Sequence, residues 1–583
     1  MLLKGFAKHS RTRTLAIMVL LVMALFVVRL FFIQVIRHDY YMSQAESEYV
    51  KQKVLYAKRG EIYALDGSTP VRLVMNETVY TVYADPSQVT DKQKVIDVLN
   101  KIAGGNTRKD FAQYLDIKNS LYQVLANKVT RTQAELLKKE NLAGIGFVAV
   151  SQRVYPEGQL ASQVVGFVNN DGEGKYGVEQ FSDADLRGKD GLLKTVTDVR
   201  DVPLTVGDKN VKVPAVDGKD EVLSIDRNVQ AKVEQTLASA AERTHAQHIS
   251  AIVMDPNTGK VLAMANMPTY DASKLSEVSD VSVLNNPTIS NPYEVGSVAK
   301  TFTVAMGLDQ GAITADSTYV NNGYIVVAGD TINNADKTRK LGTITMQDAL
   351  DWSLNTGMVT VMERLGDGSN ITYKARQTAY DYLHNRFRLG ATTGVELAGE
   401  LPGTVISPDD QQGNAVRYSN MSFGQGMDVS MVQAAAAFCA VVNGGNYYQP
   451  TVKAGYLKDG QYVPYQVNPA KAGVISANAS AAAREMIHHA HYATYKPADR
   501  EGYYIGGKSG TSQTIDPKTG QYRNDETIAT YLGYGGNDPA KPSYVIMTTV
   551  YGGGDFGGGA HAKPIFNEIS NWMLDYLKLA PKG

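Results

Sequence analysis

The sequence predicts an α+β protein in which one membrane-spanning helix precedes two folded domains. A long apolar run stands near the start of the chain, residues 40–220 mix alternating stretches with helical periods, and residues 221–580 combine alanine-rich helical segments with strands. A chain of 583 residues is long for one hydrophobic core, so several domains are expected. We divide it into a cytoplasmic tail at 1–14, a transmembrane helix at 15–36, a first domain at 40–220 and a second domain at 221–580.

The predicted membrane helix rests on the apolar run Leu15–Val28, which Leu30–Ile33 extends to about the length that crosses a bilayer. A cleaved signal peptide is the alternative, but the run is longer than the apolar part of such a peptide and no small-x-small cleavage pattern follows it. By the positive-inside rule, the basic residues before the run place the first residues in the cytoplasm and the rest outside the cell. These residues are Lys4, Lys8, Arg11 and Arg13.

The sequence patterns of the two domains predict different structures and roles. In the first domain, alternation at 77–83 predicts a strand and the period at 132–140 predicts a helix, but no catalytic constellation stands out, so a spacer or docking role fits. The second domain is expected to pack helices on an antiparallel sheet. Its predicted strands are 221–225, 249–254, 260–264, 527–533 and 544–550, its predicted helices include 228–242 and 564–579, and the glycine-rich tract 552–559 reads as a mobile connection.

Composition excludes several classes of site. A formal net charge of -1 gives no reason to expect nucleic acid. Cys439 is the single cysteine and lies in the apolar run Ala434–Val442, so no intrachain disulfide or cysteine zinc site is possible and a buried helical thiol is expected. The segment Glu485–His491 carries three histidines at helical spacing that could hold a metal, but a solvated helix face is the favoured interpretation.

The first chemical motif is Ser297-Val-Ala-Lys300, which opens the apolar helical run 301–308. A three-residue step places both side chains on one helix face, where hydroxyl and amine can touch. Lysine can take the serine proton only if burial and a nearby cation lower its pKa. Backbone N–H groups at a helix amino terminus can stabilise an oxyanion. The pattern therefore predicts Ser297 as a nucleophile and Lys300 as its base.

Two further motifs follow in the same half of the chain. In Ser353-Leu-Asn355, one hydroxyl can relay a proton and one amide can hold a substrate amide. In Lys508-Ser-Gly-Thr511, the lysine and the hydroxyls can bind a carboxylate, and the glycine lets a ligand backbone approach closely. The second of these suits a peptide that binds as an added strand. The predicted substrate-binding residues are thus Asn355, Ser509, Gly510 and Thr511.

A competing interpretation concerns residues 502–509, which match the phosphate-loop spelling G-x-x-x-x-G-K-[ST]. A phosphate loop needs a strand before it and a helix after it, and residues 510–517 do not read as helical. The extracytoplasmic compartment also lacks ATP. Tight nucleotide binding by the soluble portion would reverse this judgement.

The three motifs, in this order, resemble the defining triplet of the class B penicillin-binding proteins, the serine D,D-transpeptidases that crosslink peptidoglycan. The resemblance implies the penicillin-binding and serine β-lactamase-like transpeptidase fold after an α+β pedestal domain. The likeness covers nearly the whole chain. Its further motifs are 59–62, 153–156 with Gly166, 177–179 and 186–191 in the pedestal, and 255–259, 424–426, 443–445 and 562–566 in the catalytic half.

Residue roles follow from the resemblance. It implies that Ser297 is acylated, that Lys300 is its base and that Ser353 passes the proton to the leaving D-alanine of a stem peptide ending in D-Ala-D-Ala. It further implies that Asn355 orients the donor peptide, that Lys508 tunes the electrostatics, that Ser509 and Thr511 bind the terminal carboxylate, and that the backbone N–H groups of Ser297 and Thr511 form the oxyanion hole. β-Lactams are expected to inhibit the enzyme covalently, and no metal or cofactor is implied.

One departure and several alternatives accompany the resemblance. Val295 stands where the family usually has proline. The glycosyltransferase motif that the bifunctional class carries after the anchor is not found here, so crosslinking without polymerisation is expected. Arg29 lies at an awkward depth for a charge, so it either snorkels or contacts a polytopic glycan polymerase. A septal role is favoured over one in elongation. A β-lactamase, an antibiotic sensor or a catalytically inactive scaffold remains as an alternative.

Overall fold

The computed structural model describes residues 11–41, 50–117, 119–196, 211–493, 499–515, 519 and 521–582. The chain forms two compact units. One lies within Met1–Arg59 and Arg187–Gly218, and the other within Gly60–Leu186 and Lys219–Gly583.

The first unit contains the predicted membrane helix. Helix α1 spans Arg11–Phe31 and continues as one π-turn over Phe32–Ile36, and none of its residues is buried. Together these 26 residues are long and apolar enough to cross a membrane. The structure thus has a helix over the predicted range 15–36 that begins earlier, at Arg11, and its place in a membrane stays a prediction. Lys4 and Lys8 lie outside the described residues. The unit also holds an antiparallel sheet in the order β1 (Val50–Leu55), β8 (Gly191–Val196), β9 (Val211–Val213).

The second unit contains a seven-stranded sheet that draws strands from both sides of residue 220. Its order is β18-β17-β10-β2-β3-β4, and β5 also pairs with β3. Helices α3 (Lys92–Ala103), α4 (Phe111–Tyr114) and α5 (Arg131–Lys139) enclose a separate small core beside β3 and β4. The strands are β2 (Ile62–Asp66), β3 (Thr69–Ala84), β4 (Gln123–Val129), β5 (Ile145–Val154), β10 (Glu221–Asp226), β17 (Lys453–Lys458) and β18 (Gln461–Pro464).

A buried ion pair fixes the motifs of the amino-terminal half to one another. Arg153 Nε lies 2.7 Å from Glu179 Oε1, and neither side chain is more than 5% exposed. The Arg153 guanidinium also donates to Gly60 O and Asn76 Oδ1 at 2.7 and 3.0 Å. Removing one partner of such a pair leaves a buried charge and costs about 3–5 kcal/mol. Short elements complete this region: α6 (Ser162–Val165), β6 (Phe167–Val168), β7 (Gly174–Lys175), α7 (Gly177–Phe181) and α8 (Asp183–Arg187).

A five-stranded antiparallel sheet organises the second half of the chain, in the order β12-β11-β21-β20-β19. The hairpin of β11 and β12 and the paired carboxy-terminal strands β20 and β21 confirm the predicted strands. Strand β19 lies at the edge of the sheet and carries Lys508 to Thr511. The strands are β11 (His248–Met254), β12 (Val261–Met267), β19 (Tyr504–Ile515), β20 (Tyr522–Gly536) and β21 (Tyr544–Tyr551).

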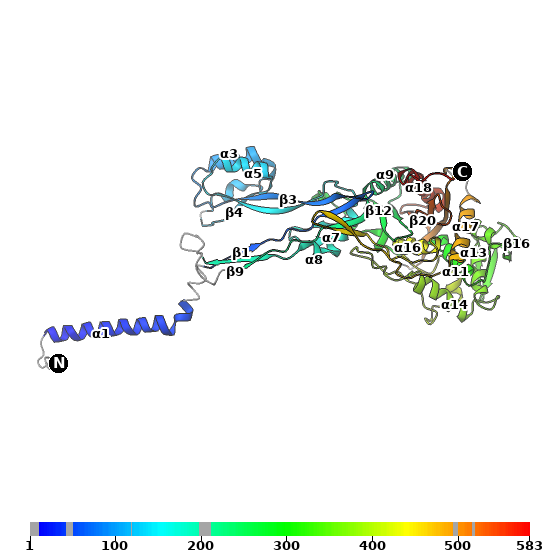
Figure 1. The fold of residues 1–583 in the computed structure, drawn as a ribbon, viewed down its shortest axis with the longest axis horizontal. Helices are drawn as coiled ribbons and strands as arrows, with labels where there is room; N and C mark the ends of the chain where they lie inside the picture. The colour runs from blue at the N-terminus through cyan, green and yellow to red at the C-terminus, as the bar shows by residue number, and fades with distance from the viewer. Residues whose placement is uncertain are drawn as a thin grey trace. The chain divides into compact units, whose positions relative to one another are not determined.

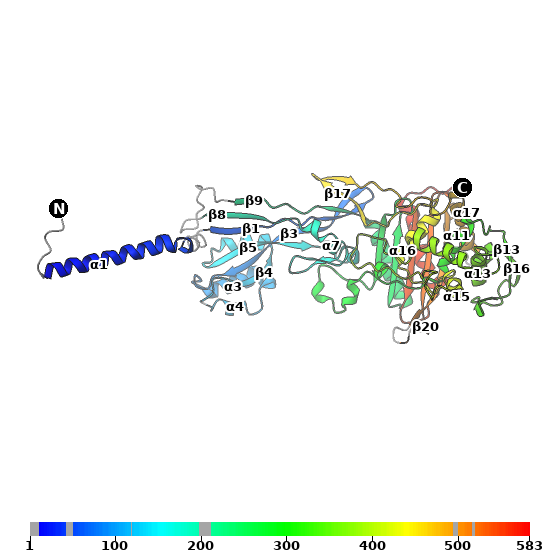
Figure 2. The same cartoon turned by 90° about the horizontal axis from the view of Figure 1, so that it is seen from below.

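Helices cover both faces of this sheet (Figures 1 and 2). Because side chains alternate along a strand, Ile249, Ala251 and Val253 of β11 pack with α9 (Arg227–Thr244) and α18 (Lys563–Tyr576). Ile252 and Met254 pack on the opposite side, with α11 (Lys300–Asp309), α16 (Met431–Val442) and α17 (Ala477–Ala493). All twelve residues of α16 are buried, which confirms the expected buried thiol of Cys439.

A second layer of helices and two hairpins lies beyond α11 and carries Ser353 in the joint between α12 and α13. Thr345 caps α12 by accepting from Asp348 N, while the Asp348 side chain accepts from Thr345 N. The helices are α12 (Met346–Asp351), α13 (Asn355–Arg364), α14 (Tyr373–Tyr380) and α15 (Ala415–Met421), and the paired strands are β13 (Thr318–Asn321) with β16 (Gly342–Thr345) and β14 (Tyr324–Val327) with β15 (Asp330–Asn333). The short helix α10 (Pro287–Ser290) instead contacts α16, β11 and β12.

Candidate active site

Ser297 lies in a tight turn that is pressed against the edge strand of the five-stranded sheet. The turn is a 3-10 segment, Gly296–Ala299, that leads directly into α11. Gly296 has φ +59°, and a Cβ at this position would lie 2.7 Å from Thr511 O and 3.2 Å from Thr511 N. Only glycine fits both the dihedral angle and the close approach. Gly296 thus holds Ser297, the predicted nucleophile, next to the backbone of Thr511.

Lys300 is fully buried and its amine is directed at Ser353. Lys300 Nζ donates to Ser353 O at 2.5 Å and to Ser353 Oγ at 3.2 Å. Burial, and secondarily the cation of Lys508, lowers the pKa of Lys300 well below its usual range. Burial and a nearby cation, the two conditions under which a lysine can act as a base, are therefore both present at Lys300.

Ser297 and Lys300 are not hydrogen-bonded to each other in this structure. Within the residues that the structure describes, the hydroxyl of Ser297 makes no hydrogen bond, and both hydrogen bonds of the Lys300 amine go to Ser353. The physical reason is that Ser353 offers the amine two acceptors at once, a carbonyl and a hydroxyl. Sequence spacing along one helix gave no information about this competing partner.

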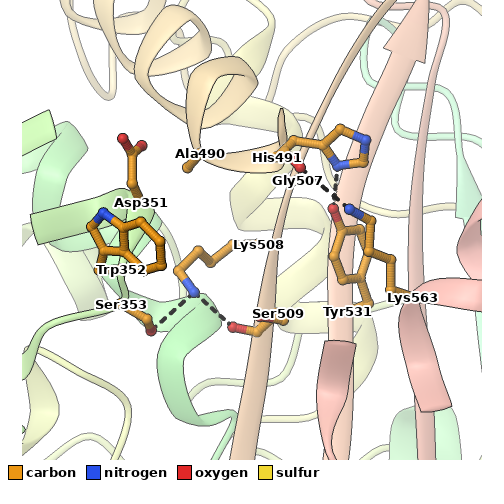
Figure 3. A pocket seen from close by; sticks show the side chains of 10 residues that line it. All are labelled: Asp351, Trp352, Ser353, Ala490, His491, Gly507, Lys508, Ser509, Tyr531 and Lys563. Atoms are coloured by element: carbon orange, nitrogen blue, oxygen red, sulfur yellow. Dashed lines mark hydrogen bonds between the residues drawn. The ribbon is translucent and has the colours of Figure 1, made fainter. Parts of the chain in front are cut away.

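A second lysine, Lys508, also donates a hydrogen bond to Ser353. Lys508 Nζ donates to Ser353 Oγ and to Ser509 O, both at 3.0 Å (Figure 3). Burial lowers the pKa of Lys508 to about 8, and the carboxylate of Asp351 opposes that shift. Ser353 has φ 56°, an uncommon conformation for a residue other than glycine. The strained backbone places one hydroxyl between two buried amines.

A cleft of about 620 Å³ opens in front of these groups. Of the predicted residues, Ser297, Ser353, Asn355, Ser509, Gly510 and Thr511 line it, whereas Lys300 is buried behind it and Lys508 lines a neighbouring pocket. Asn355 Nδ2 donates to Asn333 O at 2.9 Å, and Gly558 N donates to Thr511 Oγ1 at 3.2 Å. The predicted connection at 552–559 therefore does more than join a strand to a helix, because it contacts the edge of the cleft.

Several residues of the cleft were not singled out from the sequence. Trp352 and Asp351 immediately precede Ser353 and could have been found from that position alone. The sequence analysis pointed to Gln425 only as part of the motif 424–426, and it gave no signal for the remaining residues of the far wall and floor of the cleft. They include Ala335, Asp336, Arg339, Phe423, Gln513 and Thr527.

A second, smaller pocket of about 170 Å³ lies on the other side of Lys508 (Figure 3). Asp351, His491, Tyr531 and Lys563 line it. His491 Nδ1 is hydrogen-bonded to Tyr531 Oη, and His491 Nε2 lies 2.5 Å from Asp499 Oδ2. Burial lowers the pKa of Lys563 to about 8. Polar and charged groups thus surround the rear of Lys508 as well as its tip.

The interpretation of 485–491 as a solvated helix face holds only in part. Glu485 and His489 are exposed, and the His489 side chain is 60% exposed although its Nδ1 lies 3.0 Å from Asp351 Oδ1. His491 is buried and His488 Nδ1 bonds to Ile505 O at 2.6 Å, because the opposite face of α17 packs on β19. No group of three possible metal ligands occurs among the described residues.

The phosphate-loop alternative is also contradicted. Residues 504–515 form the single strand β19, paired with β20 from Tyr504↔Gly536 to Ile515↔Tyr522. Lys508 therefore lies in mid-strand, and no helix begins after Ser509 within β19. Phosphate loops require a backbone that curls around the anion at a helix amino terminus. An extended edge strand instead offers backbone groups to a peptide.

Comparison with known proteins agrees with this geometry. The penicillin binding protein transpeptidase domain model matches residues 249–571, and the penicillin-binding protein dimerisation domain model matches residues 54–223. Stage V sporulation protein D of Bacillus subtilis is 29% identical over 95% of this chain and 84% of its own length. Peptidoglycan D,D-transpeptidase FtsI of Escherichia coli is 26% identical over 97% of this chain and 91% of its own length.

Solved structures show the same fold. Penicillin binding protein 2X from Streptococcus thermophilus has a TM-score of 0.72 at 24% identity, covering 91% of this chain and 80% of that one. Penicillin binding protein 3 from Mycobacterium tuberculosis, complexed with aztreonam, has a TM-score of 0.67 at 25% identity, covering 91% and 98%. The transpeptidase model alone covers more than half of the chain. The chain therefore belongs to the penicillin-binding protein transpeptidase family and, with a dimerisation domain before its transpeptidase domain, is a class B penicillin-binding protein.

Proposed function

We propose that this protein is a serine D,D-transpeptidase that crosslinks peptidoglycan stem peptides through an acyl-enzyme on Ser297. The observation that carries the proposal is the convergence of Lys300 and Lys508 on the hydroxyl of Ser353, at the edge of the cleft that Ser297 lines. Relatives named peptidoglycan D,D-transpeptidase align over nearly the whole chain. The roles below are assigned to the residues that the sequence singled out.

In the acylation step, Ser297 Oγ attacks the carbonyl carbon of the penultimate D-alanine. Lys300 in its neutral form takes the serine proton, which its lowered pKa favours. The carbonyl oxygen becomes an oxyanion that the backbone N–H groups of Ser297 and Thr511 stabilise. The closeness of Gly296 to Thr511 supports this pairing.

When the tetrahedral intermediate collapses, the bond to the terminal D-alanine breaks and its nitrogen needs a proton. Ser353 Oγ accepts hydrogen bonds from both lysines, so it can pass a proton from Lys300 to the leaving amine. Lys508, kept cationic, together with Ser509 and Thr511 holds the terminal carboxylate. Asn355 orients the donor peptide. An acceptor amine then attacks the serine ester, the ester bond breaks, and the proton returns to Ser297.

A β-lactam would follow the same first step. Its strained amide takes the place of the D-Ala-D-Ala bond, and the opened ring stays attached to Ser297. The solved structure of penicillin binding protein 3 from Mycobacterium tuberculosis is complexed with aztreonam, which supports β-lactam binding by this chain too. A β-lactamase or sensor would use the same residues, but the relatives are named for transpeptidation or sporulation.

The location of the enzyme is also a proposal. Helix α1 would anchor the chain in the cell membrane as a single span, with the amino terminus in the cytoplasm and the catalytic domain outside. Polymerisation of the glycan would fall to a polytopic partner in the membrane, which Arg29 would contact. If the Arg29→Leu variant co-purifies with that polymerase as well as wild type does, the proposed contact is wrong. We assign the enzyme to septal synthesis, which a fluorescent fusion concentrated at the division site would support and one confined to the side wall would contradict.

One experiment tests the proposed reaction directly. The purified protein is labelled with a reporter penicillin, alongside Ser297→Ala and, as a matched control, Ser273→Ala at an exposed serine. Wild type and Ser273→Ala are expected to carry a long-lived label, and Ser297→Ala none. Absence of labelling in wild type would remove the transpeptidase assignment. Rapid release of the label would instead indicate a β-lactamase.

A further inference from the structure

The far wall of the cleft carries an arginine whose side chain is held by two contacts. Arg339 lines the cleft together with Ser297 and Trp352. Its guanidinium lies over the ring of Trp352, 4.6 Å from the centroid, and its Nε donates to Asp336 Oδ2 at 3.2 Å. The side chain remains 46% exposed. An arginine that is stacked and paired in this way loses little rotamer entropy when it binds a ligand.

The backbone beneath this arginine is tied to the catalytic motif. Asn355 Nδ2 donates to Asn333 O at 2.9 Å, and Thr356 N donates to Asn334 Oδ1 at 3.0 Å. The buried side chain of Asn321 donates to Arg339 O at 2.9 Å and to Lys340 O at 2.8 Å. Residues 333–340 are therefore held in register with Ser353 and Asn355.

The guanidinium has unused donors that a ligand can reach. In the part of the chain that the structure describes, the terminal nitrogens Nη1 and Nη2 of Arg339 make no hydrogen bond. Asp336 contacts only the inner nitrogen of the guanidinium: its Oδ1 accepts from Thr338 N and Thr338 Oγ1, and its Oδ2 accepts from Arg339 Nε. A planar pair of N–H donors matches a carboxylate in bidentate geometry. Burial of one guanidinium face against Trp352 also reduces competition from water.

We propose that Arg339 is a specificity-determining residue that binds a free carboxylate on the side chain of the stem peptide's third residue. This inference rests on the proposed transpeptidase function and adds its substrate class. Stem peptides with diaminopimelate at that position, which carries a side-chain carboxylate, are preferred over peptides with lysine, which lacks it. Trp352 supplies the stacking surface, and its place next to Ser353 couples recognition to the reacting centre.

The test uses two pairs of ligands that differ by one carboxylate. Carbenicillin is benzylpenicillin with a carboxyl group added to the side chain, and a diaminopimelate stem peptide differs from its lysine counterpart in the same way. The full-length protein is compared with Arg339→Gln, Arg339→Lys and the control Lys340→Gln. Lys340 also lies near the Trp352 ring, but it pairs with Asp348 and does not line the cleft. Acylation rates by each penicillin, and protection from labelling by each peptide, are measured.

Arg339→Gln is expected to lower the carboxylated-to-plain ratio of acylation rates at least about tenfold and to remove the preference for the diaminopimelate peptide, as loss of a charge-assisted contact implies. Arg339→Lys should lose part of the preference and Lys340→Gln none. Benzylpenicillin should acylate all variants at nearly the wild-type rate, which shows that each is folded. Equal ratios in wild type and Arg339→Gln, with normal benzylpenicillin acylation, would overturn the role of Arg339 and leave the proposed function standing. Absence of acylation in wild type would defeat the proposed function itself.

Discussion

The amine of Lys300 lies 2.5 Å from the backbone carbonyl of Ser353 and 3.2 Å from its hydroxyl. This relationship joins the first two motifs, which are more than fifty positions apart in the chain. It also places the lysine where a proton taken from Ser297 has an exit route towards a leaving group. Lys508 completes the arrangement at 3.0 Å from the same hydroxyl.

Replacing Lys300 with alanine should slow acylation by several orders of magnitude, because the serine loses its base. The fold should survive, since among the described residues the Lys300 side chain forms hydrogen bonds only to Ser353. Acylation by a reporter penicillin and the far-ultraviolet circular dichroism spectrum measure the two effects. Lys300→Met keeps the buried volume and should be equally inactive, whereas Lys274→Ala, at an exposed lysine, should behave as wild type. Near-normal acylation by either Lys300 variant would refute the role of the base.

The alkaline limb of the acylation rate should report Lys508. Its pKa of about 8 means that the cation is present below that pH and is lost as the pH rises through it. Without the cation, the terminal carboxylate of the ligand loses its partner, so the rate should fall with a midpoint near pH 8. Lys508→Arg stays charged at any accessible pH and should lose this midpoint, even if its overall rate is lower. A wild-type rate that stays flat to pH 10 would contradict the assignment.

Asp351 should set the pH at which the acylation rate falls on the alkaline side. Its carboxylate lines the pocket behind Lys508 and favours the charged amine, so Asp351→Asn should lower the pKa of Lys508 and move the midpoint to lower pH. Asp367→Asn, at an exposed carboxylate of the same domain, serves as the control. Stopped-flow acylation over pH 6–10 measures both. A midpoint that does not move, or that moves upward, would remove Asp351 as the counter-ion.

Ser353 should trade stability for activity. With φ 56° its backbone is strained, and glycine relieves that strain whereas alanine keeps it. Ser353→Gly is therefore expected to be about 1 kcal/mol more stable than Ser353→Ala, and both should lose most of their acylation rate with the relay hydroxyl. Thermal unfolding and reporter labelling give the comparison. Equal melting temperatures would show that the left-handed backbone carries no strain here.

Gly296→Ala should disable the enzyme through packing rather than chemistry. The new Cβ would lie 2.7 Å from Thr511 O, so the turn must move away from the strand that supplies Thr511 N to the proposed oxyanion hole. Gly311 is the matched control, because it has a similar φ of +65° and a Cβ added there would meet nothing within 4 Å. Gly311→Ala therefore measures only the cost in stability of a positive φ at alanine, about 1 kcal/mol. Acylation should fall sharply in Gly296→Ala and stay normal in Gly311→Ala. Similar acylation rates in the two variants would show that the close approach of Gly296 to Thr511 is not needed for acylation.

The sequence by itself determined the chemistry of this protein. Ser297, Ser353 and Lys508 stand in short motifs whose order is informative, and the apolar run after Arg11 and the strands that form the β11–β12 and β20–β21 pairs follow from local periodicity. Such features depend on residues near one another in the chain, so pattern alone reveals them.

Only the tertiary structure decided which groups meet. Lys300 bonds to Ser353 rather than Ser297, His491 is buried by β19 and β20 rather than solvated, and β10 pairs with β2 from the other side of residue 220. Arg339 reaches the cleft only because Asn321 and Trp352 hold it there. Each outcome depends on contacts between segments far apart in sequence, where burial and competing hydrogen-bond partners override the local preference of either segment.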